Sequence, residues 1–174
     1  MTMPLMTLPR GVQGRLEVQP RWPARQVALA PEAWLRLQQA AACLPDSIGL
    51  ILTRGYEAPS ARLGLARRIF RYAGMGVFRA VYPARRAEVA DIFGANGHDV
   101  DGHHVDVSIR WQGRRLRLLP LGVFTSSSWQ ARRVSRFQPV VQQVQQALQQ
   151  QGFLLHRNAT EALQIHCDLQ LTAT

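Results

Sequence analysis

The feature that most constrains the fold is a strict alternation of polar and apolar residues over 104–109, where the chain reads HVDVSI. Successive side chains of a β-strand point to opposite faces of the sheet, so the three apolar residues fit a buried face. His104 and Asp106 then share the other face, about 7 Å apart along the strand, and both can approach one point. The segment predicts a core strand whose second face is either ordinarily solvated or part of a polar site.

A second segment near the C-terminus has the same pattern. Residues 164–169 read QIHCDL, so Gln164, His166 and Asp168 share one strand face and three apolar residues share the other. A single histidine on a strand is more often structural than a ligand. Catalytic zinc usually takes about three protein ligands. If the two strands are partners, His166 can join Asp106 as one of these ligands.

The rest of the chain predicts an α+β fold. The expected elements are a helix over 31–43, a strand over 48–56, a helical segment over 60–93, a hairpin over 105–121 and a helix over 136–153. Helices come first and a hairpin-rich sheet later, which favours a small antiparallel sheet packed against N-terminal and C-terminal helices. We expect one domain over 31–174, preceded by an extended N-terminal arm over 1–30, where prolines and arginines show little periodicity.

Length and composition limit the class of protein. A chain of 174 residues can build one proper core, and its 47% apolar content argues against disorder. The N-terminus has prolines and charges where an export signal needs an apolar stretch. We therefore expect a cytoplasmic protein, or one exported by a non-classical or specialised secretion route. Cys43 and Cys167 are too few for a cysteine zinc site or a disulfide scaffold, so both are expected as buried free thiols.

The charge is strongly positive: 21 basic residues against 11 acidic ones give a net charge of +10. All 21 basic residues are arginine. The codon bias of a GC-rich genome would explain part of this excess, which weakens the inference from charge to partner. Arg67, Arg68 and Arg71 form a basic face in the helical segment, either simply solvated or in contact with an anionic surface. Nucleic acid is a weaker interpretation, because aromatic residues make up only 7% and no nucleic-acid-binding motif is present.

The two alternating segments resemble the paired motifs of the zinc-site superfamily that joins D-alanyl-D-alanine carboxypeptidases and dipeptidases, lysostaphin-type endopeptidases and the hedgehog signalling domain. In the carboxypeptidase and hedgehog branches the first motif reads His-x-x-Gly-x-Ala-x-Asp, and in the hedgehog branch the second reads close to His-x-His-Cys. Here residues 99–106 read DVDGHHVD and residues 164–167 read QIHC. The residues in register are Gly102, Asp106, His166 and Cys167. The resemblance extends over roughly 31–171 and implies a zinc-peptidase-like domain.

The resemblance implies a zinc ion held by Asp106, His166 and one further ligand. The family's first ligand position falls on Asp99, and His98 reaches it through a one-residue insertion. His104 stands where the family has a small residue, so it could be a ligand itself or fill the pocket. We take His98, Asp106 and His166 as the predicted ligand set, with Asp99 and His104 as the open alternatives for the first position.

The resemblance further implies hydrolysis of short peptidoglycan-type peptides that contain D-amino acids. Glu161 corresponds best to the family's glutamate and would be the general base, with His104 as a second proton-transfer residue. Substrate contacts are expected from Arg54, Tyr56 and Gln164. Arg54 is a substitute for the family's arginine after Gly-Tyr, a position that is Glu57 here.

The expected partner is therefore a peptide or cell-wall fragment, bound by a monomer. Two other functions stay open at this point. One is a catalytically inactive zinc-binding module of the same fold, as the hedgehog branch suggests. The other is an arginine-rich protein that binds a membrane surface or nucleic acid, and whose histidines are incidental.

Overall fold

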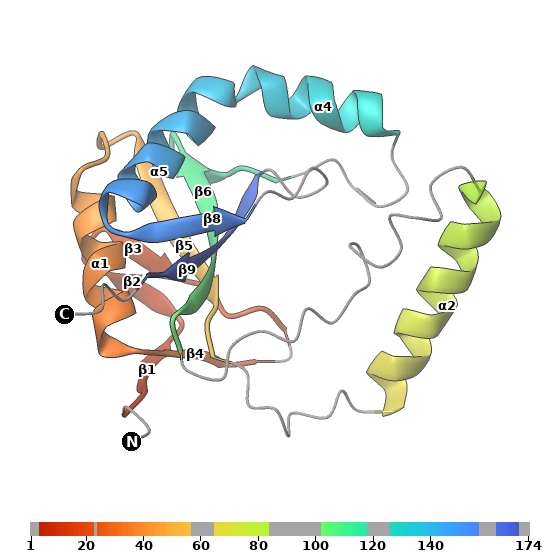
Figure 1. Cartoon of the computed structure of the whole chain (residues 1–174), viewed down its shortest axis with the longest axis horizontal. Coiled ribbons are helices and arrows are strands. Elements are labelled where there is room, and N and C mark those ends of the chain that lie inside the picture. Colours follow the sequence, from red (N-terminus) through yellow and green to blue (C-terminus); the bar gives the residue numbers. More distant parts are fainter. Residues whose placement is uncertain are drawn as a thin grey trace.

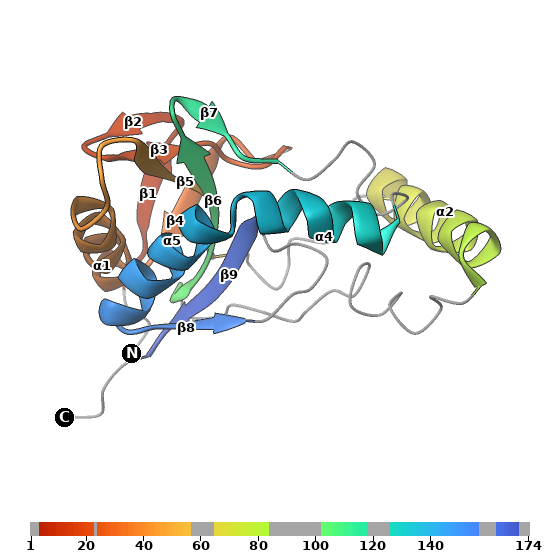
Figure 2. The ribbon, with the colours of Figure 1, turned by 90° about the horizontal axis from the view of Figure 1, so that it is seen from above.

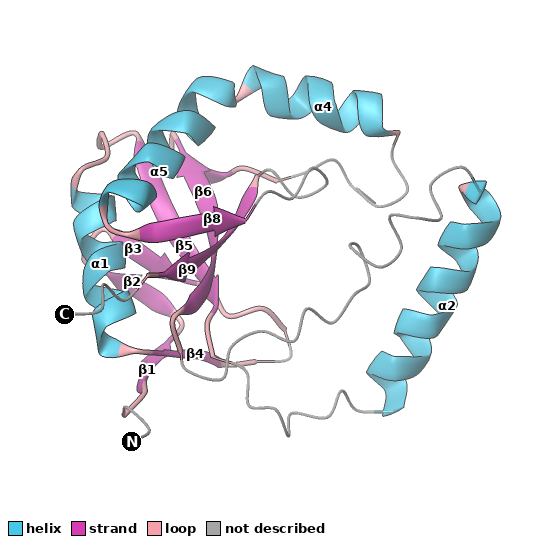
Figure 3. Cartoon of the chain, viewed as in Figure 1, coloured by secondary structure: helices cyan, strands magenta, loops and turns pink. Residues whose placement is uncertain are grey.

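The computed structural model describes residues 4–22, 24–56, 65–83, 102–117, 126–156 and 163–170. They form an α+β fold with a seven-stranded sheet, a separate two-stranded sheet and, within these residues, four helices (Figure 1, Figure 3). The strands are β1 (Met6–Pro9), β2 (Gly11–Gln13), β3 (Leu16–Val18), β4 (Gln26–Leu29), β5 (Ile48–Arg54), β6 (His104–Trp111), β7 (Arg114–Arg115), β8 (Phe153–His156) and β9 (Gln164–Leu169). The helices are α1 (Pro31–Ala42), α2 (Leu65–Val81), α4 (Ser127–Arg136) and α5 (Gln138–Gln150). The α+β prediction is confirmed, but the sheet is larger than the small one expected.

The large sheet has the order β2-β3-β5-β6-β9-β8, with β7 paired to β6 as a short hairpin. β6 lies between β5 and β9 and is antiparallel to both. Between β6 and β9, Asp106 is directly opposite His166 and His104 is directly opposite Asp168. The two alternating segments are therefore neighbours in register, as a shared site requires.

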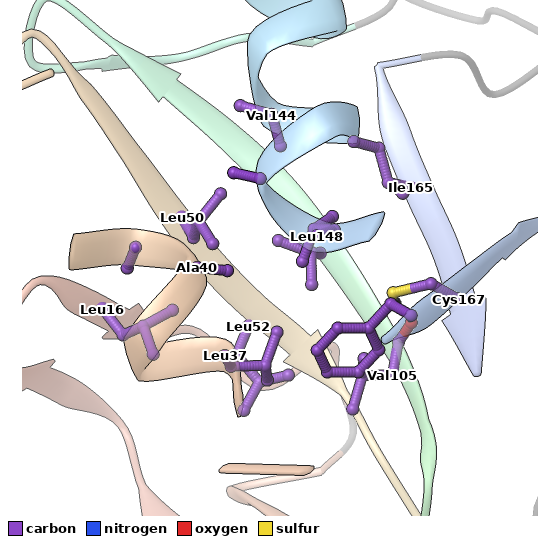
Figure 4. Close-up of a cluster of buried hydrophobic side chains, with 14 of the residues drawn as sticks. Leu16, Leu37, Ala40, Leu50, Leu52, Val105, Val144, Leu148, Ile165 and Cys167 are labelled. Atoms are coloured by element: carbon purple, nitrogen blue, oxygen red, sulfur yellow. Dashed lines mark hydrogen bonds between the residues drawn. The ribbon is translucent and has the colours of Figure 1, made fainter. Parts of the chain in front are cut away.

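The apolar face of the sheet is covered by α1 and α5, which pack on each other and on the strands (Figure 2). In α1, Pro31 fits the first turn because that position needs no N–H donor, and the buried residues that follow recur at helical spacing. The packed side chains come from both helices and from four central strands (Figure 4). They include Leu16, Leu37, Ala40, Leu50, Leu52, Val105, Val144, Leu148, Ile165 and Cys167.

Residues 1–30 were predicted to form an extended arm. Their described part instead forms four strands, β1 to β4, which pair within the two sheets. β2 and β3 belong to the large sheet, and β1 pairs with β4. Leu16 and Leu29 are fully buried in the core. These strands have only three or four residues each among prolines and arginines, so their alternation is too short to stand out in the sequence.

The helical segment expected over 60–93 is described only as α2, which lies on the side of the sheet opposite α1 and α5 (Figure 1). Its two glycines, Gly74 and Gly76, do not break the helix. Residues 57–64 and 84–101 lie outside the described residues. Within the part of the chain that is described, no helix is long and apolar enough to cross a membrane.

Two glycines fix the ends of β6. Gly113 (φ 77°) follows Gln112 (φ 50°), and this pair of positive φ angles makes the tight turn into β7. Gly102 (φ 83°) precedes β6, and a Cβ there would lie 2.4 Å from a side-chain carbon of Leu5 and 2.8 Å from the backbone nitrogen of Ala30. Gly102 therefore provides both the left-handed backbone and the close approach that start this strand.

Candidate metal centre

The polar face of β6 and β9 brings Asp106, His104 and His166 together. The Nδ1 atom of His166 lies 2.6 Å from Oδ1 of Asp106, and Nε2 of His104 lies 3.2 Å from the same oxygen. The Asp106 side chain is 1% exposed, whereas those of His104 and His166 are 13% and 20% exposed. One buried carboxylate thus lies between two imidazoles that reach toward solvent.

These three residues could hold a metal ion. Each offers one ligand atom, and the three atoms all lie within 4.8 Å of one another. Two imidazoles and a carboxylate are a donor set suited to zinc and to other divalent transition ions. A metal would replace the hydrogen-bonded protons between the ligand atoms, and the three residues would leave the fourth position of a tetrahedral ion to water or substrate.

The charges of the cluster are strongly coupled. Burial alone would raise the pKa of Asp106, but hydrogen bonds from His104 and His166 hold it well below its ordinary range. Burial alone would lower the pKa of His104, but hydrogen bonds to Asp106 and Asp168 raise it. Asp106 is therefore an anion near neutral pH, which a cation bound between the histidines would complement.

The second ring nitrogen of His104 extends the cluster outward. Its Nδ1 atom lies 2.6 Å from Oδ1 of Asp168, and Oδ2 of Asp168 lies 2.5 Å from Nε2 of His156 on β8. Burial would raise the pKa of Asp168, but these contacts with His156 and His104 lower it. A carboxylate on one ring nitrogen of a histidine fixes its tautomer and ring orientation, so Asp168 orients Nε2 of His104 toward Asp106.

Arg54 and Gln164 surround the inner carboxylate. Nη1 of Arg54 lies 4.0 Å from Oδ2 of Asp106, and the amide nitrogen of Gln164 lies 3.5 Å from the same oxygen. The hydroxyl of Thr53 donates to the backbone carbonyl of Asp106 at 3.0 Å, which fixes the strand at this point. The side chain of Arg54 is partly exposed to solvent.

The structure brings together five of the predicted site residues. The five are Arg54, His104, Asp106, Gln164 and His166. Tyr56 lies just beyond β5, where its backbone N–H donates to the carbonyl of Ala28, and its predicted substrate contact stays a prediction. His98, Asp99 and Glu161 lie outside the described residues, as do the side chains of Arg67, Arg68 and Arg71. Among the described residues, His104 completes the ligand set with Asp106 and His166.

The sequence reasoning missed the ligand-type residues Asp168 and His156. A signal for Asp168 was present, because His104-x-Asp106 and His166-x-Asp168 are the same motif on two strands. Antiparallel pairing in this register places each histidine opposite the aspartate of the other motif. His156 carries no such signal, since its place beside Asp168 depends on β8 pairing with β9.

The two cysteines have different environments. Cys167 is buried on the apolar face of β9, and burial together with the charges of Asp106 and Asp168 raises the pKa of its thiol. Its sulfur donates toward the backbone carbonyl of Val105 at 3.7 Å, so it is a packing residue and not a ligand. The prediction of a buried thiol is wrong for Cys43, which is exposed because it caps the end of α1.

Comparisons with known proteins add no family assignment. No protein-family model, curated protein or solved structure matches this chain.

Proposed function

We propose that this protein is a zinc-dependent hydrolase of peptide bonds in short peptidoglycan-type peptides that contain D-amino acids. One observation carries the proposal: the ligand atoms of His104, Asp106 and His166 lie within 4.8 Å of one another on two paired strands. Support also comes from the resemblance of residues 99–106 and 164–167 to the zinc-site motifs of the peptidase superfamily. His104 replaces His98 as the first ligand in this proposal, because it lies with Asp106 and His166.

Each residue has a defined part. His104 and His166 bind through Nε2 and Nδ1, Asp106 supplies the buried negative charge, and Asp168 holds the ring of His104 in place. A zinc ion held by these residues would supply Lewis-acid chemistry: it would polarise a scissile carbonyl and lower the pKa of a bound water molecule toward ~7. Glu161 is proposed as the general base that takes the proton and passes it to the leaving amine.

The charges around the centre favour an anionic substrate group. Arg54 lies 4.0 Å from Asp106 and is partly exposed, so its guanidinium can bind a carboxylate. A divalent ion beside it adds positive charge on the same side of the sheet. A peptide with a free C-terminal carboxylate close to the scissile bond therefore fits the proposed site, with Gln164 as a further polar contact.

Hydrolysis of defined peptides tests the proposal. The purified chain with one equivalent of zinc is incubated with a short peptide that ends in two D-alanine residues, and with its L-alanine counterpart. We expect cleavage of the D-peptide, a loss of at least about 100-fold in rate for His166→Ala, and no change for Arg67→Ala. Mass spectrometry of the products identifies the bond that is cleaved.

Zinc binding without hydrolysis of either peptide would contradict the proposed activity and would favour a catalytically inactive zinc-binding module. Equal cleavage by His166→Ala and the unmodified chain would contradict the role of His166 and of the metal-binding group in the reaction. Steeply salt-dependent binding to DNA or anionic vesicles, without stoichiometric zinc, would support the arginine-rich binding protein instead.

A further inference from the structure

A second group of metal-binding atoms lies at the outer end of the cluster. Nδ1 of His104, the carboxylate of Asp168 and a ring nitrogen of His156 all lie within 4.8 Å of one another. The three residues come from β6, β9 and β8, three neighbouring strands of the large sheet. His104 is common to this outer group and to the inner group of His104, Asp106 and His166, and it contacts them through different ring nitrogens.

The two groups differ mainly in their access to solvent. The inner carboxylate, Asp106, is 1% exposed, whereas Asp168 and His156 are 41% and 48% exposed. An ion at the outer group can therefore be reached from solvent and can take water as its remaining ligands. Its environment also screens charge more strongly than the inner position does.

We propose that the outer group is a second, weaker site for a divalent transition ion, and that the imidazole of His104 bridges the inner and outer ions. The proposal rests on the proposed zinc centre for the inner ion, but it adds a metal position that the centre itself does not need. Imidazole nitrogen and carboxylate oxygen suit zinc, copper, nickel and cobalt more than calcium or magnesium.

Binding of two ions to the imidazole of His104 requires the loss of its proton. A neutral imidazole carries one proton on its two nitrogens, so binding of metal at both nitrogens of His104 releases that proton to solvent. Nδ1 of His104 and Nε2 of His156 would exchange their hydrogen bonds to Asp168 for metal bonds. The neutral imidazole of His156 would then carry its one proton on Nδ1, and Asp168 would keep its negative charge. Two divalent ions on one ring repel each other, which is a further reason for weaker binding of the second.

Zinc titration of the full chain separates the two positions. Calorimetry, with metal analysis after equilibrium dialysis, is expected to find two zinc ions per chain, one bound tightly and one more weakly. His156→Asn is expected to weaken the second binding event by at least about 10-fold and leave the first unchanged. Asp106→Asn is expected to remove the tight event. Leu154→Ala is the matched control, because Leu154 is exposed on the same strand as His156 and offers no ligand atom.

The outcomes distinguish this proposal from the one on which it rests. One zinc ion that is lost in Asp106→Asn and unaffected by His156→Asn overturns the outer site and leaves the inner centre standing. One zinc ion that is lost in His156→Asn and kept in Asp106→Asn overturns the inner centre. No bound zinc overturns both.

A spectroscopic measurement tests the bridge itself. When the chain is filled with two copper(II) ions, spins coupled through one imidazolate lose most of their paramagnetic resonance signal. We expect this loss at the second equivalent in the unmodified chain and no loss in His156→Asn. Two additive and uncoupled copper signals in the unmodified chain would overturn the bridging role of His104.

Discussion

The two faces of β6 and β9 use the same backbone for opposite purposes. On one face, Val105, Val107 and Cys167 are fully buried under α1 and α5, among aliphatic side chains. On the other face, Asp106 is almost as completely buried, yet its partners are imidazoles, an amide and a guanidinium. Asp106 is thus buried almost as deeply as these three residues, and its neighbours have a different chemistry.

The difference indicates which face stabilises the fold and which face could hold a metal ion. Buried aliphatic groups contribute roughly 25 cal/mol per Å² of apolar surface removed from water. A buried carboxylate, by contrast, must recover a large desolvation cost from its partners, and apolar replacements of such groups are often neutral or stabilising. The polar face is therefore expected to contribute little to stability and to be necessary for metal binding.

The largest expected effect is a loss of zinc affinity when Asp106, on the polar face, is replaced. Asp106→Asn removes the buried negative charge between the two histidines, and outer partners of metal ligands alone are worth about 10–100-fold in affinity. We expect zinc affinity to fall by more than about 100-fold, measured by competition with a chelating dye. Asp46→Asn, which removes a fully exposed carboxylate paired with Arg15, is the control and should bind zinc as the unmodified chain does. Similar zinc affinities for both variants would remove the functional distinction between the faces.

The next largest effect is a loss of folding stability when a buried residue under the apolar face is truncated. Leu148 is fully buried in α5 against the strands, so Leu148→Ala leaves a cavity and should lower the free energy of unfolding by about 2–5 kcal/mol. Urea unfolding of the metal-free chain measures this change. Leu154→Ala, at a half-exposed leucine, should change it by only about 0.5 kcal/mol. The folded Leu148→Ala chain should still bind one tight zinc ion; loss of that ion would show that the faces are not separable.

A smaller effect is expected at the start of β6, where both faces begin. Gly102→Ala places a Cβ against Leu5 and the backbone of Ala30 in a left-handed conformation, and should cost about 1–3 kcal/mol of folding stability. Thermal unfolding measures the loss. Gly76→Ala is the control, because it lies in α2 with open space around it and should not destabilise the chain. Equal stability of Gly102→Ala and the unmodified chain would contradict the role given to this turn.

The smallest effect is the pH dependence of the metal-free chain. The folded state raises the pKa of His104 above its ordinary value of about 6.5, so it binds this proton more tightly than the unfolded chain does. The resulting stabilisation is complete below about pH 6.5 and is lost as the pH rises through the folded pKa. Unfolding in urea with a chelator, from pH 6 to about pH 9, should show this loss, and His104→Gln should lack it.

Zinc should reverse this trend, because its ligands must be deprotonated. The stabilisation by zinc is therefore expected to increase over the same pH range. The contradicting result would be a stability of the metal-free unmodified chain that rises with pH, while that of His104→Gln does not. Such a result would contradict the hydrogen bonding described for the cluster.

Much of the fold could be predicted from local sequence patterns. The alternation in β6 and β9, the apolar run in β5 and the helical spacing in α1 and α5 each extend over enough residues to predict an element. The strands before residue 30 are too short for this, and β3 is stabilised by parallel pairing with β5 across α1. α4 was missed because its ten residues include few apolar ones.

The site was predictable to the extent that it depends on strand alternation. Asp106 and His166 could be proposed because each shares a strand face with other polar residues. The role of His104 depends on ring orientation, which Asp168 fixes from another strand. The place of His156 depends on which strand is next to β9, and no pattern within one strand contains that information.

The central claim is that His104, Asp106 and His166 bind one metal ion together. A crystal structure of the zinc-loaded chain, with data recorded at the zinc absorption edge, tests it most directly. We expect an anomalous peak about 2.0–2.2 Å from Nε2 of His104, a carboxylate oxygen of Asp106 and Nδ1 of His166. Zinc-loaded crystals with no anomalous peak between these three residues would contradict it.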